Sequence, residues 1–232
     1  MIVIVPLAGP DFEGDDGLVK SERLVQGLPL LRRALESRAW WGDAVAQLIF
    51  VLRDTPRSRQ FARQHLTSWY PTADTIFLST GTLGAAFSAA AGLSLIRDPD
   101  APLIVDLCDI LFDVDLDVAG AFARSAGLGG LAVTFESDRP KYSYLTFDDR
   151  GDMLAAREKV VISNVASAGV YIFRSSGVFL RALAGMVEQR ETLAHNGALF
   201  VCPMLNGVKD QGLAVRGAAA SNVIDVADAR LV

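Results

Sequence analysis

The sequence predicts an α/β fold with three α/β/α layers, in which helices cover both faces of a mixed, mostly parallel central sheet. In the first half of the chain, short runs of β-branched residues alternate with helical patterns, which is typical of parallel strands joined by helices. In the second half, several extended segments are separated only by short turns, which indicates antiparallel pairing at one side of the sheet. The chain has 232 residues, of which 51% are hydrophobic, so it can bury a core of this size.

The first half contains four apolar runs that predict buried strands. These strands are expected at Ile2–Leu7, Gln47–Leu52, Asp74–Leu78 and Leu103–Leu107. The segments between them have helical patterns, and we expect helices at Leu28–Arg38, Thr55–His65 and Thr82–Leu95.

The second half is richer in extended segments. Strands are expected at Leu131–Ser137, Tyr142–Phe147, Asp152–Val160, Gly169–Phe173, Leu213–Arg216 and Asn222–Asp225. Helices are expected at Ser175–Gln189 and near Phe200–Lys209. No repeat, low-complexity tract or Pro/Gly/Ser-rich linker interrupts the chain, so we interpret residues 1–232 as a single domain.

Charge and composition exclude several classes of function. The 22 basic and 27 acidic side chains give a net charge of −5, which provides no general attraction to nucleic acid or to an anionic membrane. The apolar N-terminal run is too short to span a membrane, so no membrane insertion is expected. Cys108 and Cys202 are too few for a disulfide framework, which favours a reduced, cytoplasmic setting. The two histidines, His65 and His195, offer little material for a zinc site or a nucleophilic triad.

The most informative segment is Pro102–Asp109, an apolar strand that ends in a carboxylate. Open α/β sheets bind ligands at the carboxyl ends of their strands. A carboxylate at that edge suits Mg²⁺ bound to a phosphate, because hard divalent cations prefer oxygen ligands. The alternative is that Asp109 caps a turn or the next helix.

The loop that follows the first strand, residues 7–17, is also a candidate site. Its glycines would let backbone N–H groups approach a ligand closely. Its carboxylates, Asp11, Glu13, Asp15 and Asp16, would repel a triphosphate unless metal ions intervene. The alternative is a solvated acidic surface loop.

Several motifs resemble those of the sugar-phosphate nucleotidyltransferases, the pyrophosphorylases that make nucleotide-diphospho-sugars. Leu7-Ala8-Gly9 resembles the start of the family's glycine-rich signature, and the segment from Lys20 to Leu31 resembles its Pro-Lys-x-Leu…Gly-x-Pro-Leu-Leu segment. The turn Gly81–Ala85 is similar to Gly-Thr-Ala-Gly-Ala, and Cys108-Asp109 stands where the family has its first metal carboxylate.

The second half carries the resemblance further. Glu158-Lys159 and the stretch Ile162–Phe173 are similar to the Glu-Lys-Pro…Gly-x-Tyr-x-Phe block of the family. Gly197–Asn206 resembles a helix found in members that act in surface-polysaccharide pathways. Asp225 stands where the family places its second metal aspartate, although the Gly-Thr-Pro that should follow it is absent.

The resemblance implies a GT-A-like, Rossmann-like fold, with a nucleotide-binding half at residues 1–115 and a sugar-binding half at 116–232. It implies Mg²⁺ as cofactor, bound by Asp109 and Asp225, and catalytic roles for Lys20 and Asp109. The residues implied to contact the nucleotide are Leu7, Ala8, Gly9, Gly81 and Thr82. Those implied to contact the sugar phosphate are Tyr142, Ser143, Glu158, Lys159 and Gly169. Without the resemblance, Glu158-Lys159 could be an exposed ionic pair and Tyr142 a half-buried strand aromatic.

The chain departs from the family pattern at two further positions. The family's Gly-x-Gly-x-Arg supplies an arginine to the triphosphate, but no Arg or Lys occurs between Gly9 and Lys20. Lys20 could compensate in part, although an ammonium lacks the planar fork of a guanidinium. Ala198 stands where the family has a glutamate after Gly197.

Three functions follow as hypotheses. The leading one is a nucleotidyltransferase that forms an NDP-sugar and pyrophosphate from an NTP and a sugar 1-phosphate. The second is a degenerate domain that binds a nucleotide or NDP-sugar without turnover, because the arginine is missing. The third is a GT-A glycosyltransferase that uses Asp113, Asp115 and Asp117 as an Asp-x-Asp element, although capping of the next helix explains these residues better.

The sequence leaves the nucleotide base, the sugar and the oligomeric state open, including a homo-oligomer. Trp40-Trp41 and Trp69-Tyr70 could form an exposed aromatic patch for a partner. We favour the alternative that these aromatic residues pack helix ends onto the sheet.

Overall fold

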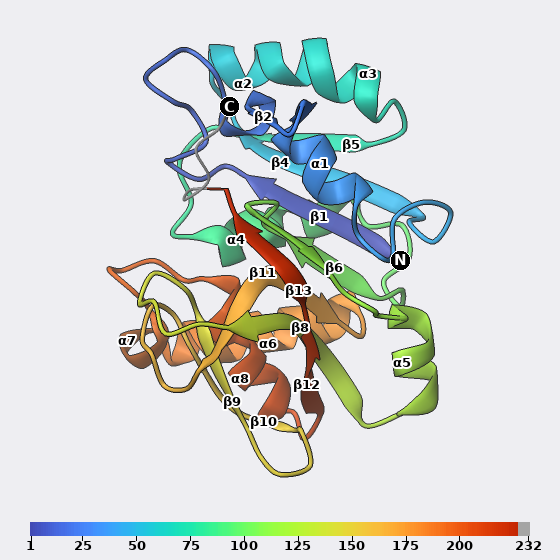
Figure 1. The fold of residues 1–232 in the computed structure, drawn as a ribbon, viewed down its shortest axis with the longest axis vertical. Helices are drawn as coiled ribbons and strands as arrows, with labels where there is room; N and C mark the ends of the chain where they lie inside the picture. The colour runs from blue at the N-terminus through green and yellow to red at the C-terminus, as the bar shows by residue number, and fades with distance from the viewer. Residues whose placement is uncertain (227–232) are drawn as a thin grey trace.

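A nine-stranded mixed sheet forms the centre of the protein in a computed structural model that describes residues 1–226 (Figure 1). The strands of this sheet are β1 (Ile2–Leu7), β4 (Gln47–Arg53), β5 (Asp74–Leu78), β6 (Leu103–Asp106), β8 (Leu128–Glu136), β9 (Tyr144–Phe147), β10 (Met153–Arg157), β11 (Val165–Phe173) and β12 (Ala214–Ala219). The order along the sheet is β10-β9-β11-β6-β1-β4-β5, and β8 pairs with β11 and β12. Two small additional sheets pair β2 (Leu24–Val25) with β3 (Leu28–Pro29), and β7 (Ile110–Asp113) with β13 (Ser221–Asp225).

The helices lie between and after these strands. They are α1 (Leu30–Glu36), α2 (Pro56–Phe61), α3 (Thr67–Trp69), α4 (Ala85–Gly92), α5 (Val118–Arg124), α6 (Ser176–Glu188), α7 (Arg190–Leu193) and α8 (Val201–Lys209). A π-helical segment, η2 (Ala62–Leu66), joins α2 to α3, and short 3₁₀ turns occur at η1 (Lys20–Glu22) and η3 (Leu93–Leu95). None of the helices in residues 1–226 is both long and apolar enough to cross a bilayer.

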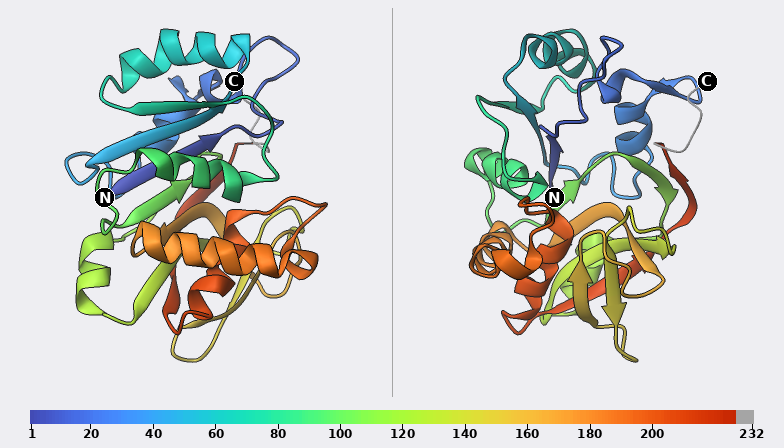
Figure 2. Two further views of the ribbon diagram at one scale, coloured as in Figure 1. Left: turned by 180° about the vertical axis from the view of Figure 1, so that it is seen from behind. Right: turned by 90° about the vertical axis from the view of Figure 1, so that its left-hand side faces the viewer.

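Two hydrophobic cores lie on opposite faces of the sheet. In β1, Val3 and Val5 pack in the core that contains α1, whereas Ile2 and Ile4 pack in the core that contains α4, α6 and α8. Successive side chains of a strand point to opposite faces, so this division places the sheet between two helical layers. Figure 2 shows α4 and α6 on the face seen from behind, opposite to α1.

The pairing directions confirm the predicted α/β class with a mixed, mostly parallel sheet. β1, β4, β5 and β6 pair in parallel, as do β8 and β12. Antiparallel pairing joins β11 to β6, β8 and β9, and β9 to β10, on the side of the sheet where the second half of the sequence predicts it.

Most predicted elements are present, with differences at their ends. The helix predicted from Leu28 begins at Leu30, because Leu28–Pro29 pairs as an edge of the β2–β3 hairpin. The helix predicted from Thr82 begins at Ala85, because Gly84 has a φ of +109° and belongs to the preceding loop. Short elements without a clear periodic signal, β2, β3, β7, and α7, were not predicted.

The aromatic pairs contribute to packing, as favoured from the sequence. Trp40 and Tyr70 are buried in the core beside α1. Trp41 packs edge to face on Tyr70 at a centroid distance of 5.6 Å. Trp69 packs in the same manner on Phe61 at 6.0 Å. These contacts fix helix ends and the π-helical segment against the sheet.

Candidate active site

The candidate site lies at the carboxyl edge of the parallel strands. β1 and β6 are neighbours and run in the same direction, so the loops that follow Leu7 and Asp106 emerge at one edge. β11 runs antiparallel to β6 and brings the second half of the chain to that edge. The backbone N–H of Leu107 donates to the carbonyl of Gly169 at 3.0 Å, which places Gly169 beside the loop that carries Asp109.

Asp109 follows the strand end by three residues. β6 ends at Asp106 and not at Leu107, so the strand-terminating carboxylate is Asp106. Cys108 has a left-handed φ of +55°, which turns the chain between the two aspartates. A Cβ built on Gly169 would lie 3.1 Å from Oδ1 of Asp109, so the absence of a side chain at Gly169 leaves room for this carboxylate.

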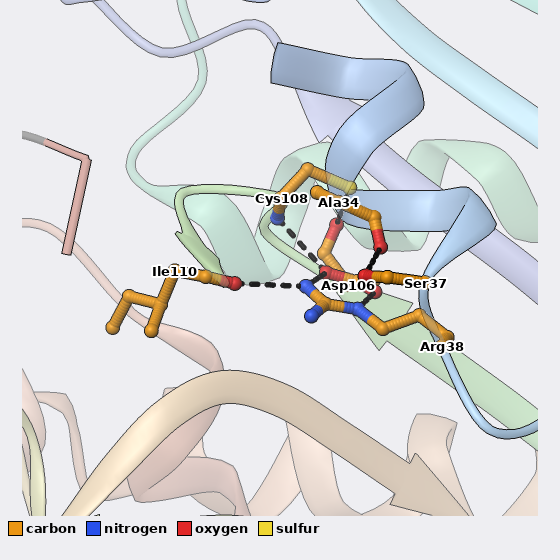
Figure 3. A network of polar contacts seen from close by, with 6 residues as sticks. All are labelled: Ala34, Ser37, Arg38, Asp106, Cys108 and Ile110. Carbon is orange, nitrogen blue, oxygen red and sulfur yellow. Dashed lines mark hydrogen bonds and ion pairs between the residues drawn. The ribbon is translucent and has the colours of Figure 1, made fainter. Parts of the chain in front are cut away.

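A buried ion pair beneath this turn was not predicted from the sequence. Arg38 donates from Nε to Oδ2 of Asp106 at 2.7 Å and from Nη2 to Oδ1 at 3.0 Å, and both side chains are fully buried (Figure 3). Oδ1 of Asp106 also accepts the backbone N–H of Cys108 at 2.9 Å. Arg38 lies just after α1, and no sequence pattern links it to a residue 68 positions away.

Asp225 reaches the same region through the β7–β13 pair. In this antiparallel pair Asp225 stands opposite Ile110, the residue after Asp109. The N–H of Val226 donates to the carbonyl of Asp109 at 3.4 Å. The fold therefore brings together the two residues that the resemblance assigns to a metal. The side chain of Asp225 remains 13% exposed, so it is not sealed in the core.

Burial is the largest influence on the pKa of Asp109, and the charge of Lys20 is the second. Burial raises the pKa of Asp109, and the charges of Asp106, Asp225 and Asp11 raise it further. The Lys20 ammonium acts in the opposite direction and is the largest influence that lowers this pKa. A divalent cation would relieve the repulsion between these carboxylates. No group of three or more His, Cys, Asp or Glu side chains able to hold a metal occurs in the described part of the chain.

Two neighbouring residues contact the Asp225 carboxylate. Nζ of Lys141 lies 2.6 Å from Oδ2, and the Tyr142 hydroxyl donates to the same oxygen at 2.7 Å. Tyr142 also packs edge to face on Phe135 at 5.0 Å. β9 begins at Tyr144, so the alternative that Tyr142 is a half-buried strand aromatic is wrong about the strand. It is right about the burial, because Tyr142 is half-buried and packs against the core. Tyr142 also touches the carboxylate assigned to the metal.

Ser143 and Glu158, both assigned to the sugar phosphate, are hydrogen-bonded to each other. The Ser143 hydroxyl donates to Oε2 of Glu158, whose residue is only 9% exposed. Burial raises the pKa of Glu158, while Ser143, Lys159 and His195 lower it and Asp109 raises it. The alternative of an exposed Glu158-Lys159 pair is therefore wrong for the glutamate.

Lys159 follows the buried glutamate with an exposed side chain. It has a left-handed φ of +53°, and its Nζ lies 5.6 Å from the centre of the Phe200 ring. The strand that precedes Lys159 is β10, and Asn206 on α8 supports it. The side-chain amide of Asn206 donates to the carbonyl of Ala156 at 2.9 Å, and its oxygen accepts the N–H of Ala156 at 3.0 Å. Asn206 therefore holds β10 as an additional strand would.

The residues assigned to the nucleotide differ in exposure. Leu7 and Ala8 are buried, whereas Gly81 is exposed. The Thr82 hydroxyl lies 2.6 Å from the Ser88 hydroxyl and thus closes its loop onto α4. Gly84 approaches Leu199 closely: a Cβ would lie 2.2 Å from the Leu199 carbonyl oxygen. The two loops are further joined by a 2.7 Å bond from the N–H of Leu199 to the carbonyl of Leu83.

The acidic loop after β1 is partly tied to the protein. The Glu13 carboxylate accepts from the hydroxyls of Thr55 and Ser58, the latter at 3.0 Å. Lys20 pairs with the exposed Asp11 at 3.2 Å. The solvated-loop alternative is therefore wrong for Glu13, although Asp15 and Asp16 are exposed as it expects.

The Asp-x-Asp candidates lie on the surface. Asp117 is the N-cap of α5 and accepts the N–H of Gly120 at 2.8 Å. Asp113 accepts from the side-chain amide of Asn222 at 2.7 Å, and Asp115 is exposed. The capping interpretation is confirmed for Asp117.

Solved structures with this fold are known, although sequence comparisons give no relatives. No protein-family model and no curated protein matches the chain. The chain is similar to a nucleoside-diphosphate-sugar pyrophosphorylase from Vibrio cholerae RC9, with a TM-score of 0.80, 22% identity, and coverage of 97% of this chain and 95% of the other. It is similar to an inositol-1-phosphate CTP transferase from T. maritima, with a TM-score of 0.69, 14% identity, and coverage of 96% and 86%.

A third similar structure is a Bacillus anthracis protein assigned as a glucose-1-phosphate thymidylyltransferase, with a TM-score of 0.69, 13% identity, and coverage of 97% and 88%. At these identities the likeness establishes the architecture. The chain has the sugar-phosphate nucleotidyltransferase fold.

Proposed function

We propose that this protein is a nucleotidyltransferase that joins an NTP and a sugar 1-phosphate to form an NDP-sugar and pyrophosphate. The observation that carries the proposal is the meeting of Asp109 and Asp225 across the β7–β13 pair. The charge of Lys20 lowers the pKa of Asp109, and the charge of Asp109 raises the pKa of Glu158. The fold shared with pyrophosphorylases supports the same class of reaction. The nucleotide-binding half is residues 1–115 and the sugar-binding half is 116–232.

The reaction needs an in-line attack on the α-phosphorus of the NTP. A phosphate oxygen of the sugar phosphate forms the new P–O bond, and the bond between the α-phosphorus and the bridging oxygen breaks, so pyrophosphate leaves. Such transfers depend chiefly on positioning and on electrostatic stabilisation. The residues of this chain therefore have to hold two anionic substrates close together.

The residues present fit a hard divalent cation. Asp109 and Asp225 offer only oxygen donors, and the like charges that raise the pKa of Asp109 favour a cation beside it. We propose that these two residues hold Mg²⁺, whose remaining ligands are phosphate oxygens and water. When bound, the cation neutralises phosphate charge and orients the phosphates.

On the nucleotide side, the backbone of Leu7–Gly9, Gly81 and Thr82 lines the phosphate and base site. Lys20 supplies positive charge next to Asp109, in place of the missing arginine. Among the described residues Lys20 forms its ion pair with the exposed Asp11, which solvent screens, so it can turn to a phosphate at small cost.

On the sugar side, Glu158 accepts hydrogen bonds from sugar hydroxyls and Ser143 holds its carboxylate in place. The exposed Lys159 binds the sugar phosphate as a point charge. Gly169 leaves the space in which Asp109 and the phosphate meet, since it has no side chain. Tyr142 lines the same pocket from the side of Asp225.

A domain that binds NDP-sugars without turnover is the second candidate. One observation favours it: the loop that should hold the triphosphate offers no cation between Gly9 and Lys20, and it contains Glu13, whose carboxylate faces Thr55 and Ser58. An active site that lacks one preorganised charge typically loses 10²- to 10³-fold in rate.

The test measures pyrophosphate release with the four NTPs and a panel of sugar 1-phosphates in the presence of Mg²⁺, alongside calorimetric binding of the same ligands. Turnover that is lost in Asp109→Asn supports the proposal. Binding without turnover supports the second candidate. Asp117→Asn is the matched control, because asparagine also caps a helix. Transfer of sugar from an intact NDP-sugar to an acceptor, unaffected in Asp109→Asn, would instead favour a glycosyltransferase that uses Asp-x-Asp.

The wider role is also a proposal. NDP-sugars are donors for polysaccharide synthesis, and the likeness of Gly197–Asn206 to members in surface-polysaccharide pathways supports a place there. NTP substrates and two buried free cysteines are compatible with a cytoplasmic location. The same assay panel identifies the base and the sugar.

A further inference from the structure

We propose that Arg38 is a positioning residue that fixes Asp109 and Asp225 relative to each other. The inference rests on the proposed function, because it concerns the two carboxylates assigned to Mg²⁺ there. Arg38 does not touch either carboxylate. It contacts both ends of the segment 106–110 that carries Asp109 and leads into β7.

The first contact fixes the turn before Asp109. The two hydrogen bonds from Arg38 orient the Asp106 carboxylate, and Oδ1 of that carboxylate then accepts the N–H of Cys108 (Figure 3). This bond from Asp106 to the residue two positions later stabilises a turn. Cys108 is held in a left-handed conformation that a non-glycine residue rarely adopts. The direction in which Asp109 leaves the turn therefore depends on the Arg38–Asp106 pair.

The second contact fixes the strand that carries the other carboxylate. Nη2 of Arg38 donates to the carbonyl of Ile110 at 3.1 Å, and the guanidinium carbon lies 4.0 Å from the centre of the Phe112 ring. Ile110 and Phe112 belong to β7, and Asp225 on β13 stands opposite Ile110. One guanidinium thus connects the turn before Asp109 with the strand pair that holds Asp225.

Stability alone does not explain a charge pair in this place. Both side chains are fully buried, and Nη1 of Arg38 has no hydrogen-bond partner among residues 1–226. Burying two charges costs about as much as their attraction returns, and apolar replacements of similar volume are often neutral or stabilising. Apolar side chains could fill this space, but they could not hold a carboxylate, a carbonyl and an aromatic ring at fixed distances. This difference points to positioning.

The experiment compares the double variant Arg38→Met/Asp106→Leu with the natural chain and with Arg174→Met. The double variant removes both charges together, so neither is left buried without its partner. Arg174 is a matched control, because its guanidinium also binds backbone carbonyls, including Leu128 at 2.6 Å, and lies 5.0 Å from the Phe122 ring. It follows the end of β11 that pairs with Leu103, at the opposite edge of the sheet from Asp106.

Two quantities are measured in each protein. Binding of Mn²⁺, a paramagnetic substitute for Mg²⁺, is followed by the loss of its free spin-resonance signal, with and without NTP. Hydrogen exchange of peptides covering residues 103–113 and 221–226 is followed without metal. We expect the folded double variant to bind Mn²⁺ roughly 10- to 100-fold more weakly and to exchange faster in both peptides. Arg174→Met should match the natural chain in both measurements.

Arg38→Lys should fall between the two, because an ammonium keeps the charge but cannot hold Asp106 and Ile110 together. A folded double variant with natural exchange and natural Mn²⁺ affinity would overturn the inference. Failure of the natural chain to bind Mn²⁺ would contradict the proposed function instead, and the exchange data would then decide by themselves whether Arg38 holds the two segments.

Discussion

Replacing Gly169 by alanine should damage the candidate metal site without unfolding the protein. Gly169 has a φ of +76°, so a side chain there adds left-handed strain of roughly 1–2 kcal/mol. The new Cβ would also lie 3.1 Å from Oδ1 of Asp109 and 3.4 Å from Cβ of Leu107. The contact with Leu107 is an ordinary one, but the contact with Asp109 is too tight, so the carboxylate must move by a few tenths of an ångström.

That displacement matters because Mg²⁺ requires near-ideal octahedral geometry, with metal–oxygen distances defined to about 0.2 Å. The added methyl also removes water from a carboxyl group whose pKa burial already raises. We therefore expect Mn²⁺ to bind at least about 10-fold more weakly, the magnitude typical of a disturbed metal environment. The rate of pyrophosphate release should fall at least as much.

Gly151→Ala is the matched control for backbone strain. Gly151 has a similar φ of +79°, but nothing lies within 4 Å of a Cβ at that position. Both variants should lose about 1–2 kcal/mol of unfolding free energy, which corresponds to about 2–4 °C in Tm for each kcal/mol. Only Gly169→Ala should lose metal affinity. If Gly169→Ala bound Mn²⁺ like the Gly151→Ala variant, the placement of the metal beside Asp109 would be refuted.

Further predictions concern charge and stability. Arg38→Met alone should lose about 3–5 kcal/mol of unfolding free energy, because it leaves the Asp106 charge buried without its partner. The double variant Arg38→Met/Asp106→Leu should have nearly the same stability as the natural chain. Equal denaturant midpoints for all three proteins would contradict this prediction. Asp109→Asn should raise the Tm of metal-free protein at pH 7. The pKa of Asp109 is higher in the folded protein than in the unfolded chain. At a pH between these two pKa values the unfolded chain therefore binds fewer protons than the folded protein, so the free energy of unfolding decreases as the pH rises. This gain in Tm should vanish in acid below pH 3.8, which thermal melts at several pH values in EDTA can check. Lys20→Met should reduce kcat for pyrophosphate release by roughly 10²-fold, whereas Lys20→Arg should retain activity. Unchanged kinetics in Lys20→Met would exclude the role proposed for the Lys20 ammonium.

Much of the fold follows from local patterns that the sequence displays. The runs Ile2–Leu7 and Asp74–Leu78 become β1 and β5 with the predicted bounds, because β-branched and apolar residues in a short run favour a strand. The predicted Ala-rich helix was correct in type, but its first turn was lost to the loop of Gly84. Contact with Leu199, far away in the sequence, determines that difference.

The candidate site could be predicted only in part. The motifs mark Lys20, Asp109 and Glu158 as candidates, but they do not show that Glu158 is buried against Ser143 or that Tyr142 reaches Asp225. These side chains come from loops that follow different strands. The periodicity of residues along one segment carries no information about contacts between side chains of different segments.

The sequence by itself determined the α/β class and most of the strands, and it marked Asp109 and Asp225 as candidate metal ligands. Only the tertiary structure decided that β7 pairs with β13, which sets Asp225 next to Asp109, and that Arg38 lies buried against Asp106. Strand and helix preferences arise from neighbouring residues along the chain, whereas these contacts arise from the packing of segments far apart in sequence.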